Sequence, residues 1–576
     1  MKTFTNELII NCDCNSIDER YDIFQIKSND KYIKRGSKIL DLNLETIESI
    51  AFDDGASVFA LFSKNAIKSF ELQEMVGEDL MTKKLFAHEL KPYILARLLL
   101  FAMAKSDYKD FAFSNLTGKL YLFKSEWIAS SRKTFVALNI DIKSLGEESA
   151  KLSCSACTFT QAKLFKSTKV LETYPRYVFS VKGTLKRVFD KADDSYVRKN
   201  RSGKKAEVPF LSFKRGSEKL NKSYFLCSIV EQFNNKYDGL ATLSFKEKEI
   251  ERKIEARKDG PFFDKVVELL IGKEINLVNM ANATEDADVF EYMSNRIQEL
   301  LPLTAISISD QIKNKEMNIV LIHNQDYYKE NDIPDPYSTF DRSTPVQCVT
   351  LEDACYKDSD VIYKTIIKEL EIKNEIINHR KILIDNWKSY DNKKSYVFGL
   401  MIENTSYFMN VSPSGDFKLI KRSGLFASFK EELYRKLERI LFGIKGEEKL
   451  IVADDSDNVN VISDSGIIPL PNKELFDSES PRGKEMKEKA LAGILDINVY
   501  KNIDGSHQYS SGPIGKTLNI SIPTAPHIYN VAIQQGEEIV TSLTETLGVQ
   551  FVKYNSFTVL PYPFKYIREW INMSSI

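Results

Sequence analysis

The sequence is poor in the residues that carry redox and hydrolytic metal chemistry. It has seven cysteines, five histidines and three tryptophans among 576 residues. An odd number of cysteines scattered along a long chain argues against a disulfide framework. The histidines lack the spacing of a catalytic triad or of a zinc hydrolase, and they are His88, His323, His379, His507 and His527. The sequence therefore supports neither a disulfide-stabilised fold nor a hydrolase of those two kinds.

Two cysteine pairs have the only spacing that suggests a metal. Cys154 and Cys157 are spaced as in a zinc knuckle, and Cys12 and Cys14 are candidates for the other half of a four-thiolate site. The second pair is spaced too closely for such a site, and small buried cysteines are common in strands. We therefore expect these residues to be structural cysteines.

Long hydrophobic runs are also missing. The most apolar window, 93–104, is too short to span a bilayer and contains Arg97. The amino terminus has no long apolar core followed by a small-residue cleavage site. With 43% hydrophobic and 28% charged residues the composition is that of an ordinary soluble protein, and we expect no membrane partner and a cytoplasmic location.

The net charge of −1 hides one strongly basic segment, residues 182–222, with 13 Lys and Arg against five Asp and Glu. Aromatic residues, among them Tyr196 and Phe210, interleave with the basic ones, which favours contact with a nucleic-acid backbone over a merely solvated face. The core of the segment, 199–205, is predicted to be a mobile loop. The candidate backbone contacts are Arg187, Arg198, Lys199, Arg201, Lys204, Lys205, Lys214 and Arg215.

The chain divides near residue 260. Residues 1–105 predict an α+β module and residues 106–180 predict mostly strands. A charged helix is expected at 246–257, directly before the Asp-Gly-Pro boundary at 259–261. From 261 to 387, helical and strand patterns alternate, which predicts a parallel, doubly wound sheet with ligands beyond the carboxyl ends of its strands.

The last 180 residues predict a second sheet. A β-hairpin with a turn at 412–415 is followed by a helix at 429–441 and by a buried strand, 449–453, that ends in acidic residues. Hairpin, helix, strand and acidic strand end are the skeleton of an RNase H-like fold. Further strands are expected at 494–500 and 517–523, before a closing Pro-x-Pro run that leads into a short helix.

In order and spacing this series resembles the MID and PIWI domains of prokaryotic Argonautes. The resemblance implies a multidomain α/β fold, with a Rossmann-like MID domain and an RNase H-like PIWI domain after α+β amino-terminal and linker domains. About 255 residues precede the MID-like part, which is tight for a PAZ domain, as in the PAZ-less, inactive Argonautes of plasmid-eliminating defence modules. The implied domains are 1–105 (N-like), 106–180 (linker 1-like), 181–260 (basic, linker 2-like), 261–388 (MID-like) and 389–576 (PIWI-like).

The resemblance also implies a pocket for the 5′-phosphate of a guide strand. The middle element of the implied pocket is a Gln that opens a strand after a Pro, and Gln347 matches it. Amide and cationic side chains suit such a pocket because they donate hydrogen bonds to phosphate oxygens. For the lysine of the following helix there are two candidates, Lys373 and Lys381. The full candidate set is Tyr337, Arg342, Gln347, Lys373, Lys381 and the terminal carboxylate of Ile576, with Mg²⁺ as a possible companion of the phosphate.

Slicing by an RNase H-type site needs several carboxylates around two metal ions. The resemblance implies a first aspartate in the opening strand, shortly after a Gly. After Gly399 the sequence continues with the apolar residues Leu400, Met401 and Ile402, and the first carboxylate, Glu403, comes about two positions too late. Asp454 or Asp455 suits the second strand, and Glu431 or Glu432 is a candidate on the helix. The resemblance implies an Asp or His in the closing helix as the last metal ligand. Arg568 stands near that position, and its positive charge repels a metal ion. We therefore expect no catalytic residues, no resident metal and no cofactor needed for catalysis.

The function implied by the resemblance is guided recognition of invading DNA without slicing. The expected partners are a short guide oligonucleotide, DNA rather than RNA, its target DNA, and an effector helicase-nuclease. Two alternatives remain: an active RNase H-like nuclease, and a scaffold subunit that binds no nucleic acid.

The segment from Gly512 to Thr517 looks like the end of a phosphate-binding loop. It lacks the first glycine of such a loop, because Ser510 stands at that position.

Overall fold

The fold comes from a computed structural model, and the part of the chain that it describes covers both halves of the sequence. The described residues are 2–28, 47–53, 57–77, 80–105, 111–116, 118–124, 127, 133–146, 149–164, 175–179, 185–188, 194–199, 208–212, 219–254, 259–281, 286–354, 359–389, 393–423, 432–444, 449–476, 497–502, 504–510, 522, 525–539, 546–547 and 560–574.

The amino-terminal module is an antiparallel sheet with helices beside it. Its strands lie in the order β3-β4-β2-β5. Helix α4 begins with a proline at its first turn, where the missing N–H costs nothing, and buries eight of its eleven residues. The α+β module predicted for this end of the chain is therefore present. The bounds are β2 Tyr21–Ser28, β3 Ile47–Asp53, β4 Ser57–Ser63, α3 Ser69–Val76, β5 Leu80–Leu85 and α4 Pro92–Ala102.

A β-rich region follows, as predicted, and its core contains many aromatic side chains. The rings of Phe135 and Phe159 stack with centroids 4.8 Å apart. Cys154 and Cys157 lie on strand β9 opposite Ile140 and Ala137, so they are ladder residues of a sheet. The bounds in this region are β6 Ala112–Leu116, β7 Lys119–Phe123, β8 Thr134–Ser144, β9 Ala150–Gln161, β10 Arg176–Phe179, β11 Leu185–Val188, β12 Tyr196–Lys199 and α6 Lys222–Lys236. Helix α1, Cys14–Arg20, belongs to the amino-terminal module, where it contacts β2.

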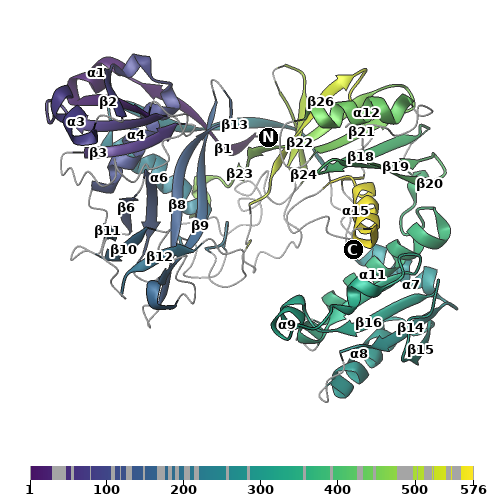
Figure 1. Ribbon diagram of the computed structural model, residues 1–576. Helices are drawn as coiled ribbons and strands as arrows, with labels where there is room; N and C mark the ends of the chain where they lie inside the picture. Colours follow the sequence, from purple (N-terminus) through teal and green to yellow (C-terminus); the bar gives the residue numbers. More distant parts are fainter. Residues whose placement is uncertain are drawn as a thin grey trace.

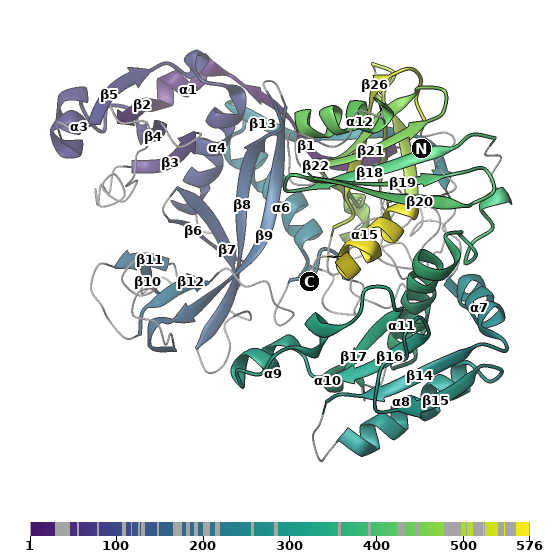
Figure 2. The same cartoon turned by 45° about the vertical axis from the view of Figure 1, so that its right-hand side comes forward.

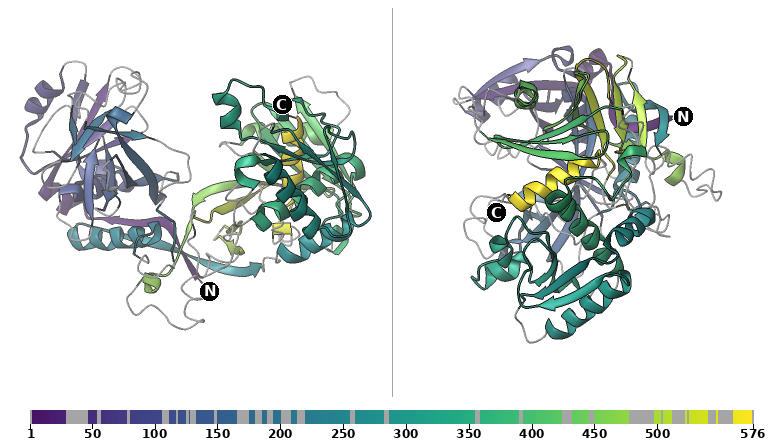
Figure 3. Two further views of the ribbon diagram at one scale, coloured as in Figure 1. Left: turned by 90° about the horizontal axis from the view of Figure 1, so that it is seen from below. Right: turned by 90° about the vertical axis from the view of Figure 1, so that its right-hand side faces the viewer.

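Two long strands, β1 (Lys2–Cys12) and β13 (Ala241–Ile254), run between the two lobes of the molecule (Figure 1; Figure 3, left). The helix expected at 246–257 is wrong, because most of this segment is β13. Its charged residues come in consecutive runs, 246–249 and 251–253, and antiparallel pairing with β1 and later with β24 (Ile497–Lys501) satisfies its backbone. Tertiary pairing thus overrides the helix propensity of Glu and Lys.

The predicted parallel sheet is present, with strands in the order β15-β14-β16-β17. Strand β15 was not predicted. The bounds are α7 Asp259–Leu270, β14 Glu274–Asn279, α8 Asp286–Leu300, β15 Ala305–Ser309, β16 Met317–Ile322, α9 Gln325–Glu330, β17 Val346–Thr350, α10 Leu351–Ala354 and α11 Ser359–Asn374.

The two faces of this sheet are covered differently. Ile275, Leu277 and Ile319 share a core with α7, α8 and α11. On the other face, Val278 and Val320 pack against residues of connecting segments, among them Ile312 and Phe340. The sheet is thus Rossmann-like in strand direction, but within the described residues its long helices share one face rather than both.

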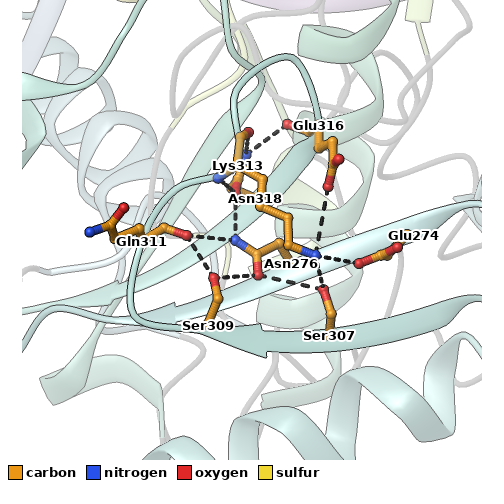
Figure 4. A network of polar contacts seen from close by, with 8 residues as sticks. All are labelled: Glu274, Asn276, Ser307, Ser309, Gln311, Lys313, Glu316 and Asn318. Carbon is orange, nitrogen blue, oxygen red and sulfur yellow. Dashed lines mark hydrogen bonds and ion pairs between the residues drawn. The ribbon is translucent and has the colours of Figure 1, made fainter.

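The loop from β15 to β16 crosses that second face and is held by a polar network (Figure 4). Asn276 donates to the backbone carbonyl of Gln311 at 3.0 Å and to Oδ1 of Asn318 at 2.8 Å. Asn318 in turn donates to the carbonyls of Lys313 and Glu316. Since both donors of each buried amide are satisfied within the network, its role is to fix the loop.

The carboxyl-terminal sheet contains the predicted succession of hairpin, helix and strand. Within its order β20-β19-β18-β21-β22-β26-β25-β24 each neighbouring pair is antiparallel. The multidomain α/β class, with a Rossmann-like sheet followed by an RNase H-like succession, is confirmed. The remaining bounds are β18 Tyr396–Ile402, β19 Thr405–Val411, β20 Phe417–Ser423, α12 Glu432–Gly443, β21 Lys449–Asp454, β22 Val459–Ile467, β23 Pro469–Leu470, β25 His507–Ser510, β26 Ile528–Gln535 and α15 Pro563–Ser574.

Helices lie on both faces of this second sheet. Helix α12 packs on the face that carries Val397 and Met401, and α15 packs on the face that carries Phe398 and Leu400. A Cβ atom at Gly399 would come within 2.6 Å of the ring of Phe408, so this position has room only for glycine. Figure 2 shows α15 between the sheet and α11. The last helix thus joins the two carboxyl-terminal sheets.

Among the described residues, no helix has both the length and the apolar character that a membrane crossing requires. The strand predicted at 517–523 lies almost wholly outside the described residues, and so does the core of the basic segment.

Candidate nucleic-acid interface

The site candidates gather at the edge of the parallel sheet, where β17, α11 and α15 meet. Strand β17 is an edge strand of the parallel sheet, and α11 packs against both β17 and α15. Two elements close in sequence, β17 and α11, and the distant helix α15 therefore place side chains in one small volume, which we call the junction. It comprises Gln347, Glu369, Lys373, Lys565 and Glu569.

Gln347 and Lys373 are in direct contact. The ammonium group of Lys373 donates to Oε1 of Gln347 and to the backbone carbonyl of Val346, each at 2.7 Å. The amide Nε2 of Gln347 donates to Glu369 at 3.0 Å. The beginning of β17 is thus joined to α11 by charge-assisted hydrogen bonds, which are stronger than neutral ones.

Helix α15 supplies the rest of the junction. Lys565 forms ion pairs with Glu569 at 2.8 Å and with Glu369 at 3.1 Å. Lys373 lies 3.9 Å from the carboxylate of Glu569. Burial by itself lowers the pKa of Lys565, but Glu569 and Glu369 raise it above its ordinary value, so this lysine stays charged. Nothing in the sequence pattern pointed to Lys565, Glu369 or Glu569. Glu369 lies on α11 and contacts Gln347 directly, whereas Lys565 and Glu569 reach the junction only because α15 docks on α11.

The other predicted end-binding residues lie in different settings. Tyr337 is half-buried, and burial followed by the neighbouring Cys348 and Glu569 raises its pKa to about 12, so its hydroxyl remains a donor. Arg342 is exposed. Lys381 follows the turn after α11, where it forms an ion pair with Asp416 at 3.2 Å and an isolated β-bridge with the same residue. Ile576 lies outside the described residues.

At the carboxyl ends of the parallel strands, where a ligand was expected, strand β16 is followed directly by a histidine. His323 is buried, its Nε2 lies 3.1 Å from the carbonyl of Ala281 and its Nδ1 lies 3.3 Å from Glu352. The ring of Tyr327 stacks on it with centroids 3.6 Å apart. Gln347 instead lies near the amino end of β17, so the junction is a site at the edge of the sheet.

Few of the basic backbone candidates fall in described parts of the chain. Arg198 on β12 lies over the ring of Tyr121, with the guanidinium carbon 5.6 Å from the ring centroid, and Arg187 lies on β11 opposite Tyr177. Both are partly buried. Lys199 ends β12, but its side chain is outside the described set. Arg201, Lys204, Lys205, Lys214 and Arg215 also lie outside the described residues.

The carboxylates proposed for a slicing site do not converge. Strand β21 runs antiparallel to β18, so Asp454 lies opposite Tyr396 at the beginning of β18. Glu403 lies at the other end, in the turn to β19, with a φ of 53°. Seven residues of extended strand separate the two ends, a distance of about 23 Å. Two metal ions in one site require ligands far closer together.

Each acidic candidate has a setting of its own. Asp454 is buried and accepts hydrogen bonds from Lys394 at 2.9 Å and from Asn458 Nδ2 at 2.8 Å. Burial opposes ionisation, but these donors hold its pKa below the usual range. Asp455 and Glu432 are exposed, and Glu431 is outside the described residues. Within the described residues no three His, Cys, Asp or Glu side chains are grouped closely enough to hold a metal ion, and that set includes Cys12, Cys14, Cys154 and Cys157.

Comparison with known proteins gives remote structural similarity. No protein-family model matches the sequence, and no curated protein is detectably similar to it. Among solved structures, Argonaute of Marinitoga piezophila in complex with a 5′-OH guide RNA and target DNA is 12% identical, with 98% of this chain and 97% of that chain covered and a TM-score of 0.43. Drosophila Piwi is 10% identical, with 100% and 98% covered and a TM-score of 0.41. At such values no residue role carries over, and the junction rests on the contacts of this chain.

Proposed function

We propose that this protein recognises nucleic acid through a short guide strand, and that the 5′ end of the guide is held at the junction. The observation that carries the proposal is the direct contact of Gln347 on β17 with Lys373 on α11, at the place where α15 packs against α11. These are the residue types that the resemblance implies for holding a guide end, on the predicted strand and helix. The amide and the ammonium group supply donors that suit the oxygen atoms of a nucleotide.

In this proposal, base pairing supplies sequence specificity and the protein contacts the backbone. The basic segment 182–222 tracks the guide or the guide–target duplex, since Lys and Arg side chains neutralise phosphates. We further propose that the guide and target are DNA, that the target is invading DNA such as a plasmid, and that an effector helicase-nuclease is recruited to it in the cytoplasm.

We also propose that the protein does not slice. The separation of Asp454 from Glu403 along β18 supports this, and so does the use of Asp454 as an acceptor for the turn between β21 and β22. A protein of this kind marks a target and leaves the cutting to its partner.

The deciding experiment is to purify the protein from cells and to sequence any short nucleic acid that co-purifies. A population of short DNA of narrow length supports the proposal, and RNA would change the identity of the guide. Absence of nucleic acid, together with an affinity for single-stranded DNA that does not fall as salt rises, would favour a scaffold subunit instead. Metal-dependent cleavage of a guide-complementary strand that Asp455→Ala abolishes would favour a nuclease.

A further inference from the structure

Strand β15 is one of the two edge strands of the parallel sheet, and Figure 1 shows it at the lower right of the view. The N–H of Ala305 donates to the carbonyl of Lys273 at 2.9 Å, so Ala305 and every second residue after it point their backbone groups toward β14. The N–H and C=O groups of Ile306 and Ile308 therefore point away from the sheet. Within the described residues, none of these four groups has a hydrogen-bond partner.

Three other edge strands of this protein are covered or charged. At the opposite edge of the same sheet, Lys373 donates to the carbonyl of Val346 on β17. On β5, the backbone N–H of Thr82 donates to the side chain of Gln73 on α3 at 2.9 Å. Natural proteins protect edges in these ways because an open edge pairs with other chains. Strand β20 is protected by its cations, which are Lys418, Lys421 and Arg422.

Strand β15 has no such protection. Residues 300–309 include no charged residue, and Pro302 lies before the strand rather than in it. The side chain of Ile308 is 64% exposed. The loop after β15 turns over one face of the sheet, where Asn276 holds it, and so leaves Ile308 uncovered (Figure 4). Among the described residues, β15 is thus an uncharged edge that keeps its capacity for pairing.

We infer that β15 pairs with β15 of a second copy of this protein, antiparallel and about a two-fold axis at Ser307. In this register Ile306 of one copy lies opposite Ile308 of the other, and their outward groups form four hydrogen bonds. The contact is isologous, because the axis repeats each residue pair. The two parallel sheets then continue as one sheet of eight strands, four from each copy. This surface is separate from the junction, and the inference does not depend on the proposed function.

The chemistry of the strand suits its own copy. On the face that carries the helices, isoleucine meets isoleucine, so the exposed side chain of Ile308 gains a β-branched neighbour. On the other face serine meets serine, and small side chains suit this close approach. The nearest cation, Lys313, donates to Ser307 at 2.9 Å, but it is paired with Glu274, so no uncompensated like charges meet across the axis. A strongly charged partner would find no complement on this edge.

Sedimentation equilibrium of the full-length protein, freed of bound nucleic acid, tests the association. We expect dimer to form as concentration rises from about 1 to 100 µM, the range in which a micromolar dissociation constant populates both species. A monomer at all these concentrations overturns the inference.

Variants of the edge test its cause. Ile308→Pro removes an outward N–H and keeps every bond to β14, as edge positions allow. The dimer then loses two of its four inter-strand hydrogen bonds, and we expect its dissociation constant to rise at least about tenfold. Ile308→Lys should weaken the dimer as well, and it serves if the proline variant fails to fold. Ile271→Lys is the matched control, because Ile271 is 52% exposed but lies outside the strand. Equal dissociation constants for wild type and the Ile308 variants, or equal weakening by Ile271→Lys, overturn the inference.

Cross-linking tests the register. In the inferred pairing the two Cα atoms of residue 307 lie about 4.5 Å apart, within reach of a disulfide. Ser307→Cys treated with diamide, which takes up the two thiol hydrogens, should give a covalent dimer on a non-reducing gel. In the matched control, Ser309→Cys, the two thiols are displaced by four residues, about 13 Å along the strand, and should cross-link no more than wild type. Cross-linking of Ser309→Cys alone, or of neither variant, contradicts the pairing.

Discussion

The hydroxyl of Tyr566 on α15 donates to Oε2 of Glu375 at 2.6 Å, and both side chains are fully buried. Glu375 begins the wide helical turn that follows α11, and its Oε1 accepts from the backbone N–H of Ile384 at 2.7 Å. One carboxyl group thus ties the last helix of the chain to the segment that follows α11. The residue before Tyr566 is Lys565, which forms an ion pair with Glu369 of α11 at the junction.

This contact predicts a pH dependence of stability. Burial raises the pKa of Glu375 to about 8, above its ordinary value of 4.5. Between these values the folded chain holds a proton that the unfolded chain releases, so the contribution is complete below the ordinary value and is lost as pH rises through 8. We expect the free energy of unfolding to fall with rising pH by up to about 1.4 kcal/mol per unit from this group.

Denaturant unfolding at a series of pH values measures this slope. In Glu375→Gln the slope between pH 5 and 8 should be flatter than in the wild type, because the amide does not titrate in that range. Tyr566→Phe removes the donor and leaves a buried carboxyl oxygen without it, at a cost of about 1–3 kcal/mol. Parallel pH profiles of wild type and Glu375→Gln would show that Glu375 titrates normally.

The two candidate lysines make opposite predictions. Lys373→Met keeps the aliphatic stem but removes the ammonium group from Gln347, and we expect affinity for short single-stranded DNA to fall at least about tenfold, in line with the loss of a charge-assisted hydrogen bond. Lys381 is 38% exposed and paired with Asp416, so Lys381→Met should change affinity less than about twofold. The reverse ranking would place the guide end at the turn after α11. Thermal unfolding of both variants separates lost binding from lost folding.

Asp454 is predicted to serve stability rather than catalysis. Asp454→Asn leaves Lys394 without its carboxylate and weakens the acceptor for the backbone N–H groups of Ser456 and Asn458. We expect a loss of about 1–3 kcal/mol in the free energy of unfolding, mainly from the weakened hydrogen bonds to a buried acceptor, because Lys394 is 42% exposed and solvent screens its ion pair. Since the pKa of Asp454 is lowered, its contribution is present above the ordinary carboxyl range and fades as pH falls through the folded value. Metal-dependent cleavage that is present in wild type and absent in this variant would contradict this assignment.

The alternation of apolar and polar residues predicted most elements of the second half correctly. Strands at Met317–Ile322 and Val346–Thr350 have the predicted bounds, because short apolar runs between helical patterns leave little choice. The strand at Ala241–Ile254 was predicted as a helix over most of its length. Its charges satisfy either pattern, and only its partners β1 and β24 decide between them.

Prediction of the site was limited for a related reason. Gln347 and Lys373 are 26 positions apart on β17 and α11, with only the short α10 between these elements, so a local motif links them. Glu569 and Lys565 come from about two hundred positions later, and no sequence spacing encodes the docking of α15 on α11. The contribution of Lys565 and Glu569 is therefore visible only in the folded chain, whereas Glu369 lies on α11, four positions before Lys373.

The basic segment predicts how strongly binding depends on salt. Each phosphate contact made by a Lys or Arg releases a counterion, which contributes a slope of about −0.7 to the logarithm of affinity against the logarithm of salt for a single strand. Replacing Arg201, Lys204 and Lys205 together by Ala should therefore reduce the slope by about 2 if all three contact phosphates. The matched control replaces three exposed, ion-paired lysines outside the segment, Lys2, Lys83 and Lys265, and should leave the slope unchanged. Titrations of one oligonucleotide at four salt concentrations give both slopes, and an equal change in the two triple variants would mean that the segment acts through net charge alone.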